Sequence, residues 1–152
     1  MKLKAWVIDR QQKGLTMMAE QTFESPITSL CMTSETFLVA GLYNGTFQGW
    51  NLTTNSIDVL TAHTQAVTSL YNHQNYIISG STDGEIKVRD IANGFNPMLE
   101  GKVIPDSNPN PQGLTANLPE VRSLTLIETG AVPIVVAGDY SGQITLLTID
   151  AQ

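Results

Sequence analysis

The chain has 152 residues, of which 41% are hydrophobic and 14% are charged, and its formal net charge is −6. This composition is typical of a folded globular domain and excludes an intrinsically disordered chain. The few Lys and Arg residues do not cluster, which argues against direct binding to nucleic acid or to an anionic membrane, since both need concentrated positive charge.

The single cysteine and the two histidines limit the chemistry of the chain. Cys31 cannot form an intrachain disulfide, and one Cys with two His is too few for a zinc site of the usual ligand count. We therefore expect no metal and no cofactor, and a buried, reduced thiol at Cys31. The amino terminus lacks a signal-peptide pattern, and no stretch approaches the roughly 18 apolar residues of a membrane span. These features favour a location in the cytoplasm or the nucleus.

The first repeated unit consists of short runs that are rich in β-branched and aromatic residues. Strands are predicted at 27–30, 37–39 and 46–50, with a weaker fourth strand at 56–60. The dipeptide Asn44-Gly45 separates the second run from the third. Asn-Gly suits a tight hairpin in which both turn residues have positive φ. The pattern predicts an antiparallel meander.

The same order of runs occurs twice more along the chain. Strands are predicted at 67–70, 76–78 and 85–89, and again at 121–124, 134–136 and 143–147. Gly45 and Gly84 lie 39 positions apart, close to the roughly 40–45 residues of one blade of a β-propeller. No stretch has a convincing helical period, so we predict an all-β protein built from four-stranded antiparallel units.

A proline-rich stretch at 95–119 interrupts the spacing between the second and third units. It contains five of the seven prolines, and because proline lacks the N–H that a β-ladder needs, we predict a loop and no strand there. Long loops in compact folds are often either functional or disordered, and both alternatives are open. The candidate partner contacts in this loop are Pro105, Asp106, Asn108 and Pro109.

The middle unit resembles the WD-repeat family of β-propellers. It contains Ala62-His63, then Val67-Thr68-Ser69-Leu70, and then the run from Ser79-Gly80 through Asp83-Gly84 to Arg89-Asp90. The family usually has Gly where Ala62 stands and Trp where Arg89 stands. The resemblance implies an incomplete propeller of about 3 to 3.5 blades.

The resemblance also divides the chain into units. Residues 1–22 would be the end of one blade, 23–61 and 62–104 two blades, 105–119 the inserted loop, and 120–152 an incomplete blade. Propellers close with typically four to eight blades. We therefore expect either a fragment of a longer propeller or a half that closes by pairing with another chain.

Four residues of the middle unit are candidate site residues. By resemblance, His63, Ser79 and Asp83 belong to the buried hydrogen-bond network of the family. The same three residue types could form a nucleophilic triad, although a triad is defined by geometry and not by composition. Arg89 is either a surface group for an acidic partner or a tolerated replacement of the usual Trp.

The resemblance implies a non-catalytic scaffold that binds protein or peptide partners within a larger assembly. One alternative is a substrate-recruiting subunit of a ubiquitin ligase or of an RNA-associated complex. The other is a hydrolase on a propeller, which would need converging acidic or metal-binding residues on the inner strands. No such set occurs there, so we predict that the chain is not an enzyme.

Overall fold

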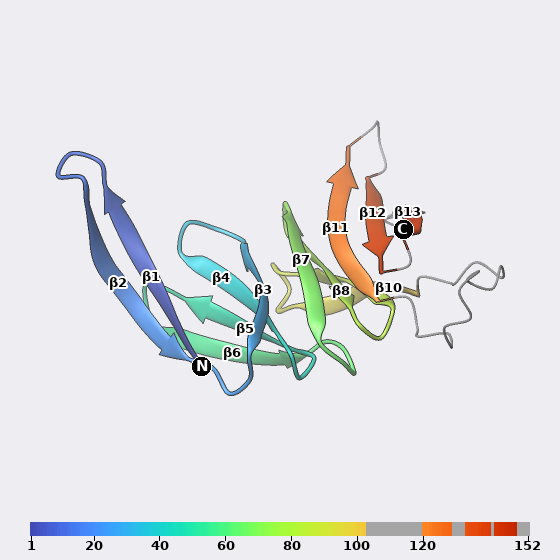
Figure 1. Ribbon diagram of the computed structural model, residues 1–152, viewed down its shortest axis with the longest axis horizontal. Helices are drawn as coiled ribbons and strands as arrows, with labels where there is room; N and C mark the ends of the chain where they lie inside the picture. The colour runs from blue at the N-terminus through green and yellow to red at the C-terminus, as the bar shows by residue number, and fades with distance from the viewer. Residues whose placement is uncertain (103–119, 129–132, 141, 149–152) are drawn as a thin grey trace.

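The computed structural model describes residues 1–102, 120–128, 133–140 and 142–148 (Figure 1). All regular secondary structure in these residues is β, as the sequence predicts. They include no helix long and apolar enough to cross a membrane. The candidate partner contacts Pro105, Asp106, Asn108 and Pro109 lie outside the described residues.

Four antiparallel sheets follow one another along the chain, and within each sheet the strands pair in sequence order. The first sheet contains β1 (Lys2–Asp9) and β2 (Gly14–Thr22). The second contains β3 (Ile27–Met32), β4 (Phe37–Leu42), β5 (Thr46–Asn51) and β6 (Ser56–Thr61). The third contains β7 (Val67–His73), β8 (Tyr76–Ser81), β9 (Glu85–Asp90) and β10 (Asn96–Lys102). The fourth contains β11 (Val121–Ile127), β12 (Ile134–Asp139) and β13 (Ile144–Thr148).

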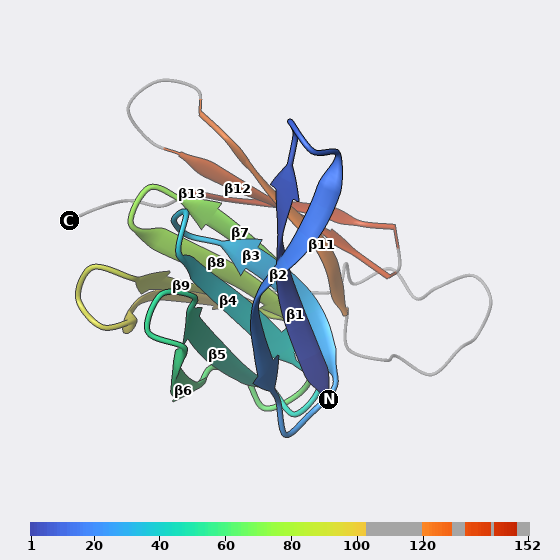
Figure 2. The ribbon, with the colours of Figure 1, turned by 90° about the vertical axis from the view of Figure 1, so that its left-hand side faces the viewer.

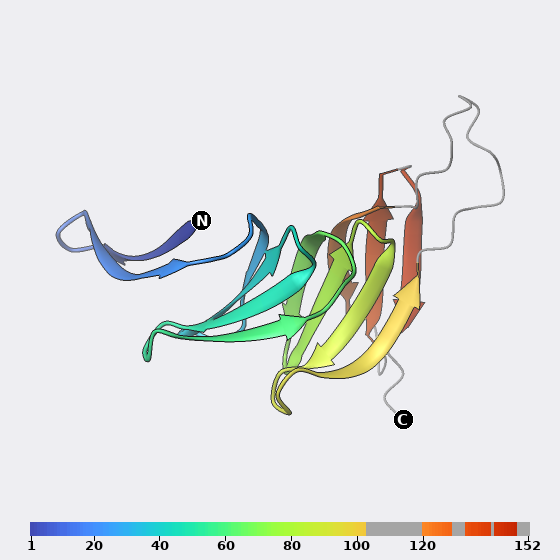
Figure 3. The same cartoon turned by 90° about the horizontal axis from the view of Figure 1, so that it is seen from below.

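The sheets stand side by side in chain order, face against face (Figure 3). Figure 2, viewed from the N-terminal side, shows β1 and β2 as the outermost sheet. The inner strands β3, β7 and β11 are neighbours, although they belong to different sheets (Figure 1). Each four-stranded meander therefore has the form of one propeller blade.

Threonine side chains link neighbouring inner strands. The Thr28 hydroxyl donates to the Gly41 carbonyl at 2.9 Å within its own sheet and lies 2.5 Å from the Val67 carbonyl of the next sheet. The Thr68 hydroxyl likewise contacts the Val121 carbonyl of the sheet that follows. These hydroxyls therefore connect consecutive sheets along their inner strands.

Two glycines of each repeat have different roles. Gly41 and Gly80 lie within β4 and β8, where an added Cβ would approach a Cγ1 atom of the next blade to 2.6 Å at Val67 and 2.3 Å at Val121. The second glycine is the turn residue, and Gly45 has φ +85° while its N–H donates to the carbonyl three residues earlier. The first glycine therefore permits close packing of blades, and the second closes the turn.

The predicted turn geometry was wrong in one respect. Asn44 and Asp83 do not have positive φ, and only the glycines that follow them do. This is the arrangement of a type I turn with glycine at its fourth position, and not of a two-residue turn with positive φ at both positions.

The hydrophobic core is divided among the interfaces between consecutive sheets. The core residues between the second and third sheets are Val39, Phe47, Ala62, Val67, Ile77 and Phe95. Those between the third and fourth sheets are Ile78, Ile86, Val88, Val121, Val135 and Ala137. A smaller cluster of Phe23, Ala40 and Leu42 packs with Leu3 and lies between the first and second sheets. Each blade thus buries its faces only against its neighbours.

Two strands were not predicted. The prediction of a loop throughout 95–119 was wrong at its start, because Asn96–Lys102 forms β10. Pro97 is accommodated since β10 is the edge strand and the register shifts between Pro97 and Leu99. The strand β2 was missed as well, and it pairs with β1 across a bulge between Ala5 and Trp6.

The two tryptophans differ in exposure. Trp6 is 49% exposed, whereas Trp50 is fully buried and its indole N–H donates to the Asn55 side-chain oxygen at 2.9 Å. Cys31 is a free thiol that is only partly buried, and this burial raises its pKa.

Candidate functional site

The three predicted network residues come from the part of the chain between β6 and β9, and their side chains meet in the structure. His63 precedes β7, Ser79 lies on β8, and Asp83 lies in the turn between β8 and β9. His63 Nε2 is 2.8 Å from the Ser79 hydroxyl, and His63 Nδ1 is 3.5 Å from Asp83 Oδ1. The geometry therefore brings together all three residues that the resemblance singled out.

The network favours a neutral histidine beside an ionised aspartate. Burial lowers the pKa of His63 to about 4, although the negative charge of Asp83 opposes this shift. Burial alone would raise the pKa of Asp83, but hydrogen bonds from the Glu85 and Thr64 amides outweigh it and the pKa lies below its ordinary value. These amides approach the Asp83 carboxylate to 2.9 and 3.0 Å. At pH 7 the network clamps the loop before β7 onto the turn before β9.

The order Ser–His–Asp is that of a nucleophilic triad, but the nucleophile is inaccessible. Ser79 is 0% exposed, and the side chain of His63 is fully buried as well. A substrate carbonyl must reach the nucleophile before any acyl transfer occurs. The arrangement therefore supports a structural role.

The same region contains a possible set of metal ligands. Donor atoms of His63, Asp83 and Glu85 lie within 4.8 Å of one another. However, both carboxylate oxygens of Asp83 accept hydrogen bonds, and Glu85 pairs with Lys87 at 3.1 Å. Asp83 and Glu85 are thus already engaged, whereas His63 Nδ1 has no hydrogen-bond partner, so the geometry does not favour a metal site here.

Arg89, the fourth candidate residue, points inward. It is 9% exposed, and its Nη1 donates to the Phe95 carbonyl at 3.3 Å. A side chain in this position braces the turn between β9 and β10 and presents little surface to a partner. Of the two interpretations of Arg89, the geometry supports the structural replacement.

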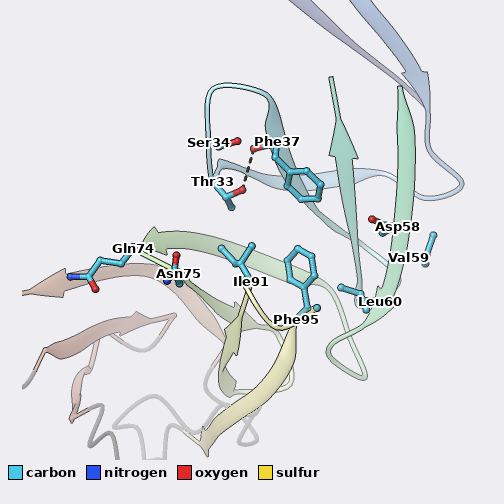
Figure 4. A pocket seen from close by; sticks show the side chains of 11 residues that line it. Thr33, Ser34, Phe37, Asp58, Val59, Leu60, Gln74, Asn75, Ile91 and Phe95 are labelled. Carbon is cyan, nitrogen blue, oxygen red and sulfur yellow. Dashed lines mark hydrogen bonds between the residues drawn. The ribbon is translucent and has the colours of Figure 1, made fainter. Parts of the chain in front are cut away.

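A groove lies between the second and third sheets, at the end of the strands opposite to His63, and we call it the interblade groove (Figure 4). Its volume is about 600 Å³. It combines the ends of three hairpins with residues 58–60 of β6. The lining residues are Thr33, Ser34, Phe37, Asp58, Val59, Leu60, Gln74, Asn75, Ile91, Gly94 and Phe95.

Two aromatic rings from different blades form the floor of the interblade groove. Phe37 from β4 and Phe95 from the turn before β10 have ring centroids 6.2 Å apart and planes inclined by 33° (Figure 4). Gly49 of β5 leaves room for this pair, because a Cβ there would lie 2.7 Å from Cζ of Phe37. The floor therefore depends on packing between blades.

The backbone at Phe95 is unusual. Phe95 has φ +61°, in the left-handed region that a bulky side chain rarely adopts, and it follows Gly94 at φ +70°. The bond from Arg89 to its carbonyl helps to hold this conformation. The result is an aromatic ring directed between the two sheets.

The rim of the interblade groove is polar. The Thr33 hydroxyl donates to the Phe37 carbonyl at 3.3 Å, and the Asn75 carbonyl accepts from the Ile91 amide at 2.7 Å. Asp58 is the one charged residue among those that line the groove. An apolar floor with a few polar groups at its rim is the usual composition of a ligand site.

Sequence reasoning missed the interblade groove. The available signal was Asn93-Gly94, a turn dipeptide that precedes Phe95 and that could have placed a hairpin before Pro97. The pairing of Phe37 with Phe95 carried no sequence signal, because it spans two blades.

Comparisons with known proteins agree with the architecture. The family model described as WD domain, G-beta repeat matches residues 54–90, so the chain contains a WD40 repeat there. The search of curated protein sequences found no match.

Two solved structures show the extent of the fold. One is Sqt1 of Saccharomyces cerevisiae, with 12% identity and a TM-score of 0.75, covering 97% of this chain and 39% of that chain. The other is a chain in the mitotic checkpoint complex, with 16% identity and a TM-score of 0.68, covering 97% of this chain and 41% of that chain. This chain therefore spans about two fifths of their length, and the prediction of an all-β, incomplete WD-repeat propeller is confirmed.

Proposed function

We propose that the chain is a non-catalytic interaction scaffold that binds a protein or peptide partner within a larger assembly. WD40 domains typically mediate protein interactions. The observation that carries the proposal is the interblade groove, an open hollow with an aromatic floor held by two packed sheets. The set of Ser79, His63 and Asp83 is buried inside the blade, which weighs against the hydrolase alternative.

We further propose that the chain acts as a subunit of a protein assembly. One of the similar folds belongs to the mitotic checkpoint complex, which is itself an assembly of proteins. That likeness supports a role as a subunit, in the cytoplasm or the nucleus. A substrate-recruiting subunit of a ubiquitin ligase or of an RNA-associated complex remains the alternative form of this role.

Further blades, or another chain, are proposed to cover the open ends of the described structure. The sheet of β1 and β2 has two strands and that of β11 to β13 has three, whereas the two sheets between them have four. Unpaired strand edges favour association with another strand. This proposal concerns the closure of the propeller and is independent of the groove.

The scaffold proposal is tested by selection from a phage-displayed library of random dodecapeptides on the immobilised chain. Selected peptides are then labelled with fluorescein and titrated by fluorescence anisotropy. We expect saturable binding that the heat-denatured chain lacks, because binding to a preformed site requires the folded sheets. If no peptide shows such binding, the scaffold proposal is wrong.

A further inference from the structure

The lining of the interblade groove favours one class of ligand. We propose that it binds an extended segment of a partner protein in which an apolar side chain is flanked by Lys or Arg residues. This inference rests on the proposed scaffold function and names its partner chemistry. It follows from the shape of the floor, the charge of the rim and the backbone of Phe95.

The floor selects an apolar side chain. Phe37, Ile91 and Phe95 meet there, and Leu60 of β6 closes one side (Figure 4). A volume of about 600 Å³ accommodates one or two side chains rather than a folded domain. Burying an apolar side chain here removes its surface from water, which favours binding.

The charge at the rim selects a basic flank. Asp58 is exposed at the groove, and none of the eleven lining residues is Lys or Arg. Glu35 follows Ser34 and Asp90 precedes Ile91, so the neighbouring positions are acidic as well. Arg89, two positions before Ile91, is turned inward to the Phe95 carbonyl. Such a rim attracts cationic segments and repels acidic ones.

The left-handed backbone at Phe95 indicates that the floor of the interblade groove is preorganised for binding. A bulky residue at φ +61° is strained, and such a conformation persists where the surroundings hold it. The Arg89 bond and the Phe37 ring supply that support. A preorganised floor reduces the entropy that binding would otherwise cost.

Two exposed positions allow the groove to be altered without disturbing the core. Asp58→Lys reverses the charge at the rim, and Ser34→Trp places an indole at the mouth. Glu24→Lys is the matched control, because Glu24 is exposed in the loop between β2 and β3, at the opposite end of the strands. All three variants are expected to keep the circular dichroism spectrum and melting temperature of the parent chain.

The test applies these variants to peptides selected from the random dodecapeptide library. We expect the selected peptides to contain an apolar residue between Lys or Arg residues. Asp58→Lys should raise their Kd by about fivefold or more, and Ser34→Trp by more than about tenfold, whereas Glu24→Lys leaves the Kd unchanged. Raising the salt concentration should weaken binding to the parent chain more than to Asp58→Lys.

The outcomes separate this inference from the scaffold proposal. Peptides that bind the folded chain equally well in all three variants would overturn the assignment to the groove while leaving a scaffold that binds elsewhere. Selected peptides that are acidic, or that lack an apolar residue, would overturn the proposed partner chemistry. The absence of any folded-state binder would overturn both.

Discussion

The buried pair of His63 and Ser79 couples the stability of the middle blade to pH. His63 Nε2 lies 2.8 Å from the Ser79 hydroxyl, and burial lowers the pKa of His63 to about 4. In the unfolded chain a histidine titrates near its ordinary pKa of about 6.5. Between these two values the unfolded state binds more protons, so the free energy of unfolding falls as the pH falls.

We expect the melting temperature to decrease as the pH is lowered from 7 to 4.5, by an amount that corresponds to a stability loss on the order of 3 kcal/mol at most. His63→Gln removes the titrating group, and the difference in stability between parent and variant should shrink over this window. Thermal unfolding followed by circular dichroism measures both curves. Parallel curves between pH 7 and pH 5 would show that His63 does not titrate in this way.

Glycine spacing determines how closely consecutive blades approach. An added Cβ at Gly80 on β8 would lie 2.3 Å from Cγ1 of Val121 and 2.8 Å from the Ser69 hydroxyl. The contact with Val121 requires β11 to move away from β8, and the contact with Ser69 requires the side chain of Ser69 on β7 to shift. Gly80 is thus a packing element of the strand.

Gly80→Ala is expected to lower the free energy of unfolding by about 1–3 kcal/mol, since overpacking strains a close interface. Gly14→Ala in β2 is the control, because an added Cβ there meets nothing within 4 Å, and its effect should stay within about 0.5 kcal/mol. Urea titration at constant pH gives both values. Equal stabilities for the two variants would contradict the close approach of β8 and β11.

The molecule presents a large apolar face at its first sheet. Trp6 pairs with Met17 and Ile8 pairs with Leu15 across β1 and β2. All four side chains are at least 49% exposed. Cross-strand neighbours share one face of a sheet, so they form a continuous apolar surface. Surfaces of this kind mark sites of association or aggregation.

We expect the isolated chain to self-associate in light scattering coupled to size-exclusion chromatography, with the apparent mass rising with concentration. The double variant Ile8→Lys, Leu15→Glu replaces an apolar pair by opposite charges at facing positions and should lower the apparent mass. Lys13→Glu in the hairpin turn is the control for a change of charge alone. A parent chain that remains monomeric at all concentrations would contradict the proposed closure by further blades or another chain.

Local information was enough to predict most of the strands. Runs such as 76–78 and 85–89 alternate or are β-branched, and the Asp83-Gly84 turn lies between them, so each strand is specified by its own residues and its nearest neighbours. β10 was missed because Pro97 is tolerated only at a sheet edge, and edge position is decided by tertiary pairing.

Some features of the candidate sites could likewise be predicted from the sequence, and others depended on the tertiary structure. His63, Ser79 and Asp83 were found because their spacing resembles a known repeat. The structure brings them together, with a hydrogen bond between His63 and Ser79 and with Asp83 3.5 Å from His63 Nδ1. Arg89 had two interpretations until its burial favoured one of them. Neither the direction of a side chain nor its exposure can be read from residue type alone.

The sequence by itself determined an all-β chain of repeated four-stranded units, because the strand period and the turn glycines act over only a few residues. Only the tertiary structure decided that Gly41 and Gly80 pack against the next blade, that Arg89 points inward, and that Phe37 meets Phe95. Those outcomes depend on contacts between sheets, which pair residues far apart in the chain and leave no local pattern. The interblade groove arises from such contacts, and so does the partner chemistry that we propose for it.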